Sequence, residues 1–194
     1  MANDQLDRDD LISGINAVIT KLQNAGESAG IRIVGGAALA LRYFDRRTTS
    51  DIDAQLVPEG SIQRAILEVA IENAWPEDWL NSNASMFVPS FSIHLEWEVL
   101  YEDEYVSVSV ASPEALLAMK IRASRPGRDE QDISKLLSIC NVRSIEEAEE
   151  LMDRYYLGDG ISTSAVRLLG PIFQQGLPPI PEIPPRPSFG PFSK

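Results

Sequence analysis

Two short groups of residues in the first third of the chain have the types and spacing that phosphate chemistry requires. Asp51 and Asp53 flank Ile52, and the pair Gly35-Gly36 precedes them. Residues i and i+2 of a strand point to the same face, so two like charges placed there favour a bound cation. Two such carboxylates can bind Mg²⁺ or Mn²⁺ that also takes phosphate oxygens.

The Gly35-Gly36 pair predicts a close approach between the main chain and a phosphate. It follows an apolar run at 31–34 and precedes an expected helix at 37–44. Glycines let backbone N–H groups approach a phosphate at a helix N-terminus, where the dipole favours negative charge. Each half alone is weak, because glycine pairs often form turns and D-x-D is common on surfaces. Their order and spacing together predict a site for a metal-bound nucleoside triphosphate.

Apolar periodicity and capping residues predict the elements that position these groups. Helices are expected at 6–25, 37–44, 62–74, 113–124, 129–139, 144–156 and 162–174, and Ser61 is the expected cap of the third. Strands are expected at 31–34, 52–57, 90–100 and 106–110. Residues 75–90 are expected to be irregular. In the strand at 90–100, alternation predicts a core-facing side that includes Trp97 and Val99.

The predicted fold class is α/β (α+β), with a small mixed β-sheet flanked by helices and a helical C-terminal part. We predict a core at 1–110, a helical part at 111–175 that carries Lys120 and Asp132, and a tail at 176–194. The tail holds seven of the 13 prolines and has no helical or strand period, which predicts an extended or disordered segment.

The motifs resemble a known superfamily. GG-x-A-L at 35–39, followed by R-x-T-x-D-I-D at 47–53, is similar to nucleotidyltransferases with the polymerase-β-like fold. The resemblance is closest to the AbiEii-like and MenT-like bacterial branch, whose members are often toxins of toxin–antitoxin pairs. A second block at 112–137 resembles later motifs of that branch: a lysine on a helix, then R-D-x-x-D-I at 128–133.

The resemblance implies roles at matching positions. Gly35 and Gly36 would hold the triphosphate, and the nucleotide would also be bound by Arg47, Thr49 and Lys120. The metals would be held by Asp51 and Asp53. The catalytic residues would be Asp51, Asp53, Lys120 and Asp132. As a point cation, Lys120 would neutralise phosphate charge. Asp132 would orient Lys120 or the nucleotide.

Structural interpretations of the second block remain open beside these roles. Lys120 is flanked by apolar residues, so its side chain could simply extend from a buried helix. Asp132 would stabilise a helix dipole at its position near a helix start. Arg128 and Asp129 would form a structural ion pair.

Composition restricts the partners. The chain has 194 residues and a net charge of −12, which excludes bulk DNA binding and a membrane-surface role. It shows no apolar run of about 20 residues and no signal peptide, so we expect a cytoplasmic protein without membrane contact. With one histidine, His94, and one cysteine, Cys140, the available metal ligands are carboxylates.

Basic residues gather in the two motif blocks. The blocks at 31–56 and 112–137 include these seven of the 17 basic residues: Arg42, Arg46, Arg47, Lys120, Arg122, Arg125 and Arg128. If the blocks meet, they form a basic pocket on an acidic body, which suits a triphosphate and an RNA end. Otherwise these arginines pair locally with neighbouring acids.

The predicted reaction moves a nucleoside monophosphate from an NTP to a hydroxyl of an RNA 3′ end or a protein, with an antitoxin protein as a further partner. Many such enzymes use a third carboxylate, for which Glu96 and Glu98 are candidates beside a solvated-face interpretation. One alternative is an antibiotic-type nucleotidyltransferase with a small-molecule acceptor. The other is a nucleotide-binding module without turnover.

Overall fold

The computed structural model describes residues 5–46, 48–58, 60, 62–89 and 95–190. The chain divides into two compact units. The first comprises Met1–Ser85, Trp97–Val110 and Ile183–Lys194, and the second comprises Met86–Glu96 and Ala111–Glu182. The candidate residues around Asp51 belong to the first unit, and those around Lys120 belong to the second.

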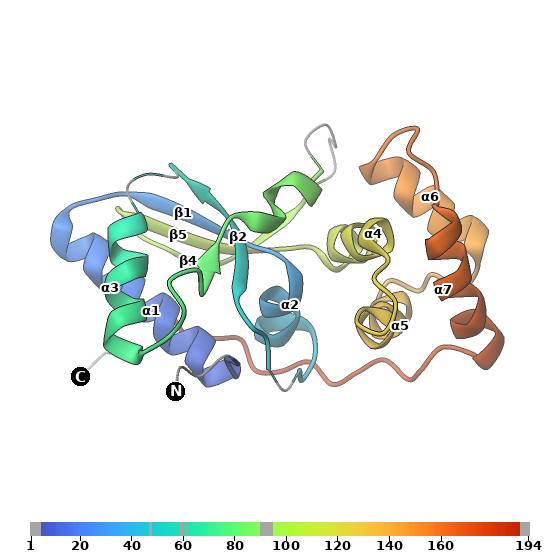
Figure 1. Ribbon diagram of the computed structural model, residues 1–194, viewed down its shortest axis with the longest axis horizontal. Helices are drawn as coiled ribbons and strands as arrows, with labels where there is room; N and C mark the ends of the chain where they lie inside the picture. Colours follow the sequence, from blue (N-terminus) through green and yellow to red (C-terminus); the bar gives the residue numbers. More distant parts are fainter. Residues whose placement is uncertain (1–4, 47, 59, 61, 90–94, 191–194) are drawn as a thin grey trace. The chain divides into compact units, whose positions relative to one another are not determined.

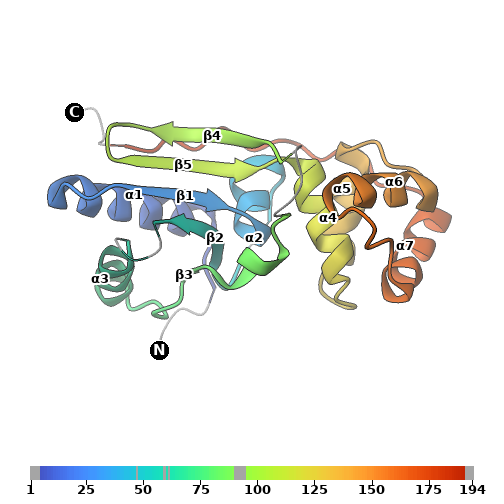
Figure 2. The same ribbon diagram turned by 90° about the horizontal axis from the view of Figure 1, so that it is seen from above.

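A five-stranded mixed sheet organises the first unit (Figures 1 and 2). Its strands are β1 (Ala29–Ile33), β2 (Ile52–Val57), β3 (Leu80–Asn81), β4 (Trp97–Glu102) and β5 (Val106–Ala111), in the spatial order β3-β2-β1-β5-β4. β1 runs antiparallel to β2 and parallel to β5, while β2 runs parallel to β3. The predicted mixed α/β class is confirmed.

Two long helices pack beside this sheet, α1 (Arg8–Ala25) and α3 (Gln63–Asn73), as Figure 1 shows. Trp79 is fully buried and donates its indole N–H to the carbonyl of Ile66 in α3 at 3.1 Å. A Cβ atom at Gly14 of α1 would lie 2.7 Å from the Trp79 ring. The tryptophan is thus a core anchor between the two helices.

The segment after β1 is helical but irregular. α2 covers Gly35–Ala38 and continues as a π-helix over Leu39–Tyr43. The expected helix at 37–44 therefore begins two residues earlier and widens in its second half. The π-turn is closed by Phe44, whose N–H donates to the carbonyl of Leu39 at 3.1 Å. Such widened turns frequently occur at functional sites.

The second unit is helical. It contains α4 (Pro113–Ala123), α5 (Glu130–Ile139), α6 (Ile145–Tyr155) and α7 (Thr163–Gln175), which match the four helices expected there. Ser112, Ser144 and Ser162 cap α4, α6 and α7 through their hydroxyls. Among the described residues, no helix combines the length and apolar composition that crossing a membrane would need.

The region between α3 and β4 differs from expectation. The irregular stretch at 75–90 contains the short strand β3 and a 3₁₀ helix at Asn83–Phe87. Within the described residues, the strand expected at 90–100 starts at Trp97. Residues 90–94 lie outside the described part of the chain, as does Ser61, the predicted cap of the helix at 62–74. The predicted core-facing side of the strand is wrong at Val99, which is 45% exposed, whereas Leu100 is 8% exposed. Among the described strands, β4 is the last in the sheet order, and apolar alternation alone did not determine the orientation of such an edge strand.

The proline-rich tail has no helix or strand over residues 176–190. In the second unit, the Ser138 hydroxyl donates to the Pro178 carbonyl at 2.7 Å. In the first unit, Arg8 of α1 donates to the carbonyl of Pro185, and Gly190 N–H donates to the Asn16 side chain at 2.9 Å. The segment is thus extended, as predicted, and its main chain is hydrogen-bonded to helices of each unit.

Candidate active site

Asp51 and Asp53 lie at the start of β2, where the strand leaves a loop. The strand alternates as predicted: Ile52, Ala54 and Leu56 are buried, and the two aspartates are half-buried. Ser50 donates its hydroxyl to Asp51 Oδ1 at 2.9 Å. The pair therefore offers carboxylate oxygens from one strand at the edge of the apolar core.

Asn81 of β3 fixes the orientation of Asp51. Its side-chain amide donates to Asp51 Oδ2 at 3.1 Å and to the carbonyl of Asp78 at 2.9 Å. Its amide oxygen accepts the N–H of Asn83 at 2.8 Å, so both ends of the amide are held. The β2–β3 register pairs Asn81 with Asp53 and explains this proximity. No motif in the sequence marks Asn81, which sequence reasoning therefore missed.

The first glycine of the pair lies against Asp53. Val34 N–H donates to the carbonyl of Asp53 at 2.9 Å, which joins the end of β1 to β2 immediately before Gly35. Gly35 has φ of +64°, and a Cβ there would lie 3.0 Å from Asp53 Oδ2. The left-handed conformation favours glycine, and the close carboxylate leaves little room for a side chain. The structure thus brings together the two halves of the predicted motif.

The second glycine lies against a different side chain. A Cβ at Gly36 would lie 2.6 Å from Arg46 Nη1 and 3.0 Å from Thr49 Oγ1. Thr49, one of the predicted nucleotide-binding residues, also donates its hydroxyl to the Asp51 carbonyl at 3.2 Å. Arg47, the other predicted residue of this loop, lies outside the described residues, as does His94.

The N-terminal segment holds this loop in place. Leu6 and Thr49 form an antiparallel bridge, with N–H···O distances of 2.7 and 2.9 Å. Leu6 is 1% exposed, and its neighbour Asp7 begins α1 with a capping box formed with Asp10. The loop that carries the R-x-T positions is thus anchored by burial at a distant point of the sequence.

Glu98, a candidate third carboxylate, is in an ion pair. Both of its carboxylate oxygens lie 2.8 Å from Nε of Arg42, which the π-helix presents. Glu96, the other candidate, belongs to the second unit, where its carbonyl accepts the N–H of Ser112 at 3.0 Å. Within the described residues, no group of three or more histidine, cysteine, aspartate or glutamate side chains is arranged to hold a metal.

Lys120 and Asp132 are brought together in the second unit. Lys120 Nζ lies 2.9 Å from Asp132 Oδ2 and 2.9 Å from Asp129 Oδ1. All three side chains are at least nine-tenths buried. Asp129 also forms an ion pair with Arg125, whose Nε lies 2.8 Å from Asp129 Oδ2. Within the described part of the chain, Asp129 therefore contacts both Arg125 and Lys120.

The electrostatics of this cluster favour the charged form of Asp129. Burial alone would raise the pKa of Asp129, but hydrogen bonds from Arg125 and Lys120 outweigh it and lower the pKa to about 2. Both the functional and the structural interpretations of Lys120 are compatible with this geometry, and its role stays a prediction.

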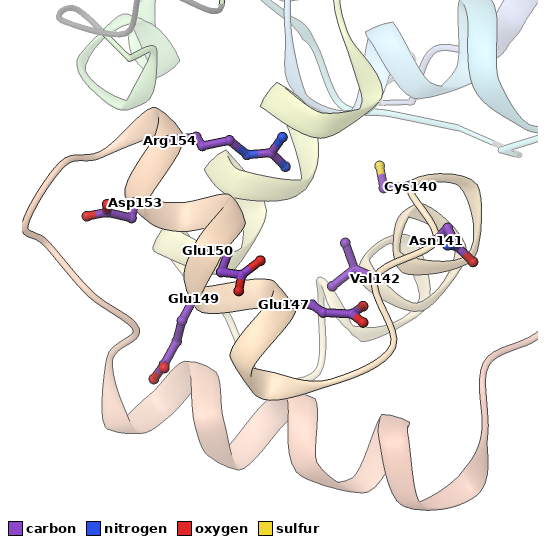
Figure 3. Close-up of a pocket in the computed structure, with 8 residues that line it drawn as sticks. All are labelled: Cys140, Asn141, Val142, Glu147, Glu149, Glu150, Asp153 and Arg154. Carbon is purple, nitrogen blue, oxygen red and sulfur yellow. The ribbon is translucent and has the colours of Figure 1, made fainter.

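A separate open hollow of about 620 Å³ lies in the second unit (Figure 3). Glu147, Glu149, Glu150 and Asp153 of α6 line it together with Cys140, the residue that follows α5. Burial raises the pKa of the Cys140 thiol to about 12, which disfavours the thiolate at neutral pH. The glutamates lie on the surface of α6. None of the predicted site residues lines this hollow.

Comparison with known proteins shows which family model this chain matches. No curated protein and no solved structure matches this chain. Residues 10–161, more than half of the chain, match the model of a family described as nucleotidyltransferase of unknown function (DUF6036). The matched range includes both glycines, the aspartate pair and the Lys120 cluster. The match supports the superfamily predicted from the motifs and does not extend to the AbiEii-like or MenT-like branch. The chain belongs to this nucleotidyltransferase family.

Proposed function

We propose that the protein is a metal-dependent enzyme that transfers a nucleoside monophosphate from an NTP to an acceptor hydroxyl. The observation that carries the proposal is the contact between the two motif halves. The carboxylate of Asp53 lies against the main chain of Gly35, at a position where a Cβ would be 3.0 Å from Oδ2. Carboxylates and an open main chain side by side suit a metal and a polyphosphate, respectively.

The donor set fits Mg²⁺ or Mn²⁺. Mg²⁺ is usually bound by one or two carboxylates plus substrate phosphates and water, so a two-aspartate site without a third protein carboxylate is sufficient. Asp51 and Asp53 would hold the ion, with Asn81 fixing the Asp51 carboxylate from 3.1 Å. When bound, the ion supplies charge stabilisation for the phosphoryl oxygens.

The proposed reaction needs only the NTP and the acceptor hydroxyl as reactants. The acceptor oxygen forms a bond to the α-phosphorus, the bond from that phosphorus to the bridging oxygen breaks, and pyrophosphate leaves. The acceptor proton passes to water. Gly35 and Gly36 would let the triphosphate approach the main chain, and Thr49 would line the same position beside Gly36. Within the second unit, we propose that Asp132 positions the Lys120 ammonium, which lies 2.9 Å from Asp132 Oδ2.

The first experiment is a transfer assay with each of four α-³²P-labelled NTPs and Mg²⁺. Total tRNA, the protein itself or no acceptor is supplied, and wild type is compared with Asp51→Ala/Asp53→Ala. Label on RNA or protein that disappears in the variant supports the proposal and identifies acceptor and base. Absence of label in all conditions, with NTP binding retained, favours a small-molecule acceptor or a module without turnover.

The acceptor and biological role are proposed from the resemblance to the AbiEii-like and MenT-like branch. We propose an RNA 3′ end or a protein side chain as acceptor, in the cytoplasm, and a toxin role neutralised by an antitoxin protein. Expression of wild type should then arrest growth, while Asp51→Ala/Asp53→Ala should not. Growth arrest that persists in the variant would contradict a role based on transfer.

A further inference from the structure

The glycine at position 36 is explained by the space beside it. Gly36 does not have the left-handed backbone conformation of Gly35, so its φ does not require glycine. A Cβ there would lie 2.6 Å from Nη1 and 3.0 Å from Cζ of Arg46, and an atom so placed would force the guanidinium to move. The missing side chain at position 36 is what allows the Arg46 guanidinium to lie against the main chain.

The guanidinium is held before any ligand arrives. Arg46 Nη1 donates to the carbonyl of Thr48 at 2.8 Å. The Thr48 hydroxyl donates to the side chain of Gln5 at 2.9 Å, and Thr49 is bridged to the buried Leu6. A side chain fixed in this way loses little conformational entropy when it binds an anion.

Charges of opposite sign therefore flank the two glycines. On the Gly35 side lies the Asp53 carboxylate, and on the Gly36 side lies the Arg46 guanidinium. A metal-bound polyphosphate has the complementary arrangement, because the cation faces carboxylates and the phosphate oxygens face donors. A planar guanidinium offers paired N–H donors that match phosphate oxygens.

Two observations fix the Arg46 guanidinium beside the glycine pair: its close approach to Gly36 and its hydrogen bond to the Thr48 carbonyl. We infer that Arg46 is a polyphosphate-binding residue of this chain and that Gly36 serves to admit its guanidinium. The inference rests on the proposed function, since it names a ligand-binding residue of the same site.

The test measures equilibrium binding of each of the four NTPs, with Mg²⁺, and of the matching nucleosides by calorimetry. Arg46→Gln and Gly36→Ala should each weaken NTP binding about tenfold or more, and Arg46→Lys should weaken it less, because charge without the fork is retained. Nucleoside binding should not change, since nucleosides lack phosphate. Matched controls are Arg64→Gln, whose side chain is 67% exposed, and Gly170→Ala, where a Cβ meets nothing within 4 Å.

The possible outcomes separate this inference from the proposed function. If wild type binds no NTP, the proposed function fails. If wild type binds NTP and Arg46→Gln binds it equally well, the inference is wrong while the proposed function stands. A parallel loss of NTP and nucleoside binding with a lowered Tm would show that Arg46 only supports the loop. Normal NTP binding by Gly36→Ala would show that the glycine does not serve this arginine.

Discussion

Lys120 and Asp129 form a buried ion pair, with Nζ 2.9 Å from Oδ1 and the two side chains 9% and 1% exposed. Nine residues separate them, so the pair joins the end of α4 to the start of α5. Asp132 shares the same ammonium at 2.9 Å. Removing one partner of such a pair leaves an uncompensated buried charge, which is strongly destabilising.

We expect Asp129→Asn to lower the free energy of unfolding by about 3 kcal/mol at neutral pH. The matched control is Asp159→Asn, which removes a carboxylate that is 46% exposed and 2.9 Å from Arg122. A surface pair of this kind contributes about 1 kcal/mol or less. Urea unfolding at neutral pH measures both. Equal effects of the two substitutions would show that the Lys120 cluster does not stabilise the second unit.

Acid should lower the free energy of unfolding of the wild-type protein by protonating Asp129. The Asp129 pKa of about 2 lies below its ordinary value of 3.8, so its contribution is fully present above about pH 4 and is lost as pH falls toward 2. The amount is on the order of 2 kcal/mol. Asp129→Asn should lack this component of acid destabilisation. Unfolding curves between pH 5 and pH 2 that run parallel for the two proteins would contradict the lowered pKa.

Because of the aspartate pair, we expect bound metal to affect the Tm of the protein as well as its transfer activity. Asp53→Asn removes one of two like charges on a strand, so we expect a Tm in EDTA no more than slightly below that of wild type. Wild type should gain Tm when Mg²⁺ and an NTP are added, because a ligand that binds the folded state stabilises it, and the variant should lose that gain.

Asp103→Asn is the control for the aspartate prediction. The Asp103 carboxylate accepts the N–H of Val106 at 2.6 Å and the hydroxyl of Tyr101, and these bonds hold its pKa at about 2 despite the opposing effect of burial. Its substitution should lower Tm in EDTA and leave the gain from Mg²⁺ and NTP intact. A ligand-dependent gain that survives in Asp53→Asn would place the metal elsewhere.

Asn81→Ala should slow transfer without abolishing it. The amide holds Asp51 Oδ2 at 3.1 Å, and loss of such an outer hydrogen bond typically costs about 10- to 100-fold in metal affinity or activity. Asn73→Ala is the matched control, because the Asn73 amide donates to the Val69 carbonyl within its own helix at 2.9 Å. Mg²⁺ titration of the transfer rate compares the two. An unchanged apparent Mg²⁺ affinity in Asn81→Ala would exclude a positioning role.

Gly35→Ala and Gly26→Ala form a matched pair. Their φ values are +64° and +66°, so a side chain strains both by about 1–2 kcal/mol. Only at Gly35 does the added Cβ meet Asp53, at 3.0 Å, while at Gly26 it meets nothing within 4 Å. We expect similar losses of Tm and a loss of transfer confined to Gly35→Ala. Equal transfer rates in the two variants would separate Gly35 from the active site.

Local signals along the chain were sufficient to predict several helices and strands. Alternation at 52–57 predicted a strand with Asp51 and Asp53 on one side, and capping serines predicted the starts of α4 and α6. These follow from side-chain periodicity and from hydrogen bonds within a few residues. The motif order predicted the superfamily, and the family match supports it.

The side chains that lie beside the aspartates and their loop come from distant parts of the chain and depend on tertiary packing. Asn81 reaches Asp51 because β3 pairs with β2, and Leu6 anchors Thr49 through a bridge across more than forty residues. Tertiary packing also decided that Leu100, rather than Val99, is buried in β4. Strand pairing is set by how sheets and helices bury apolar surface together. A local pattern along the chain therefore does not specify which partner lies beside each carboxylate.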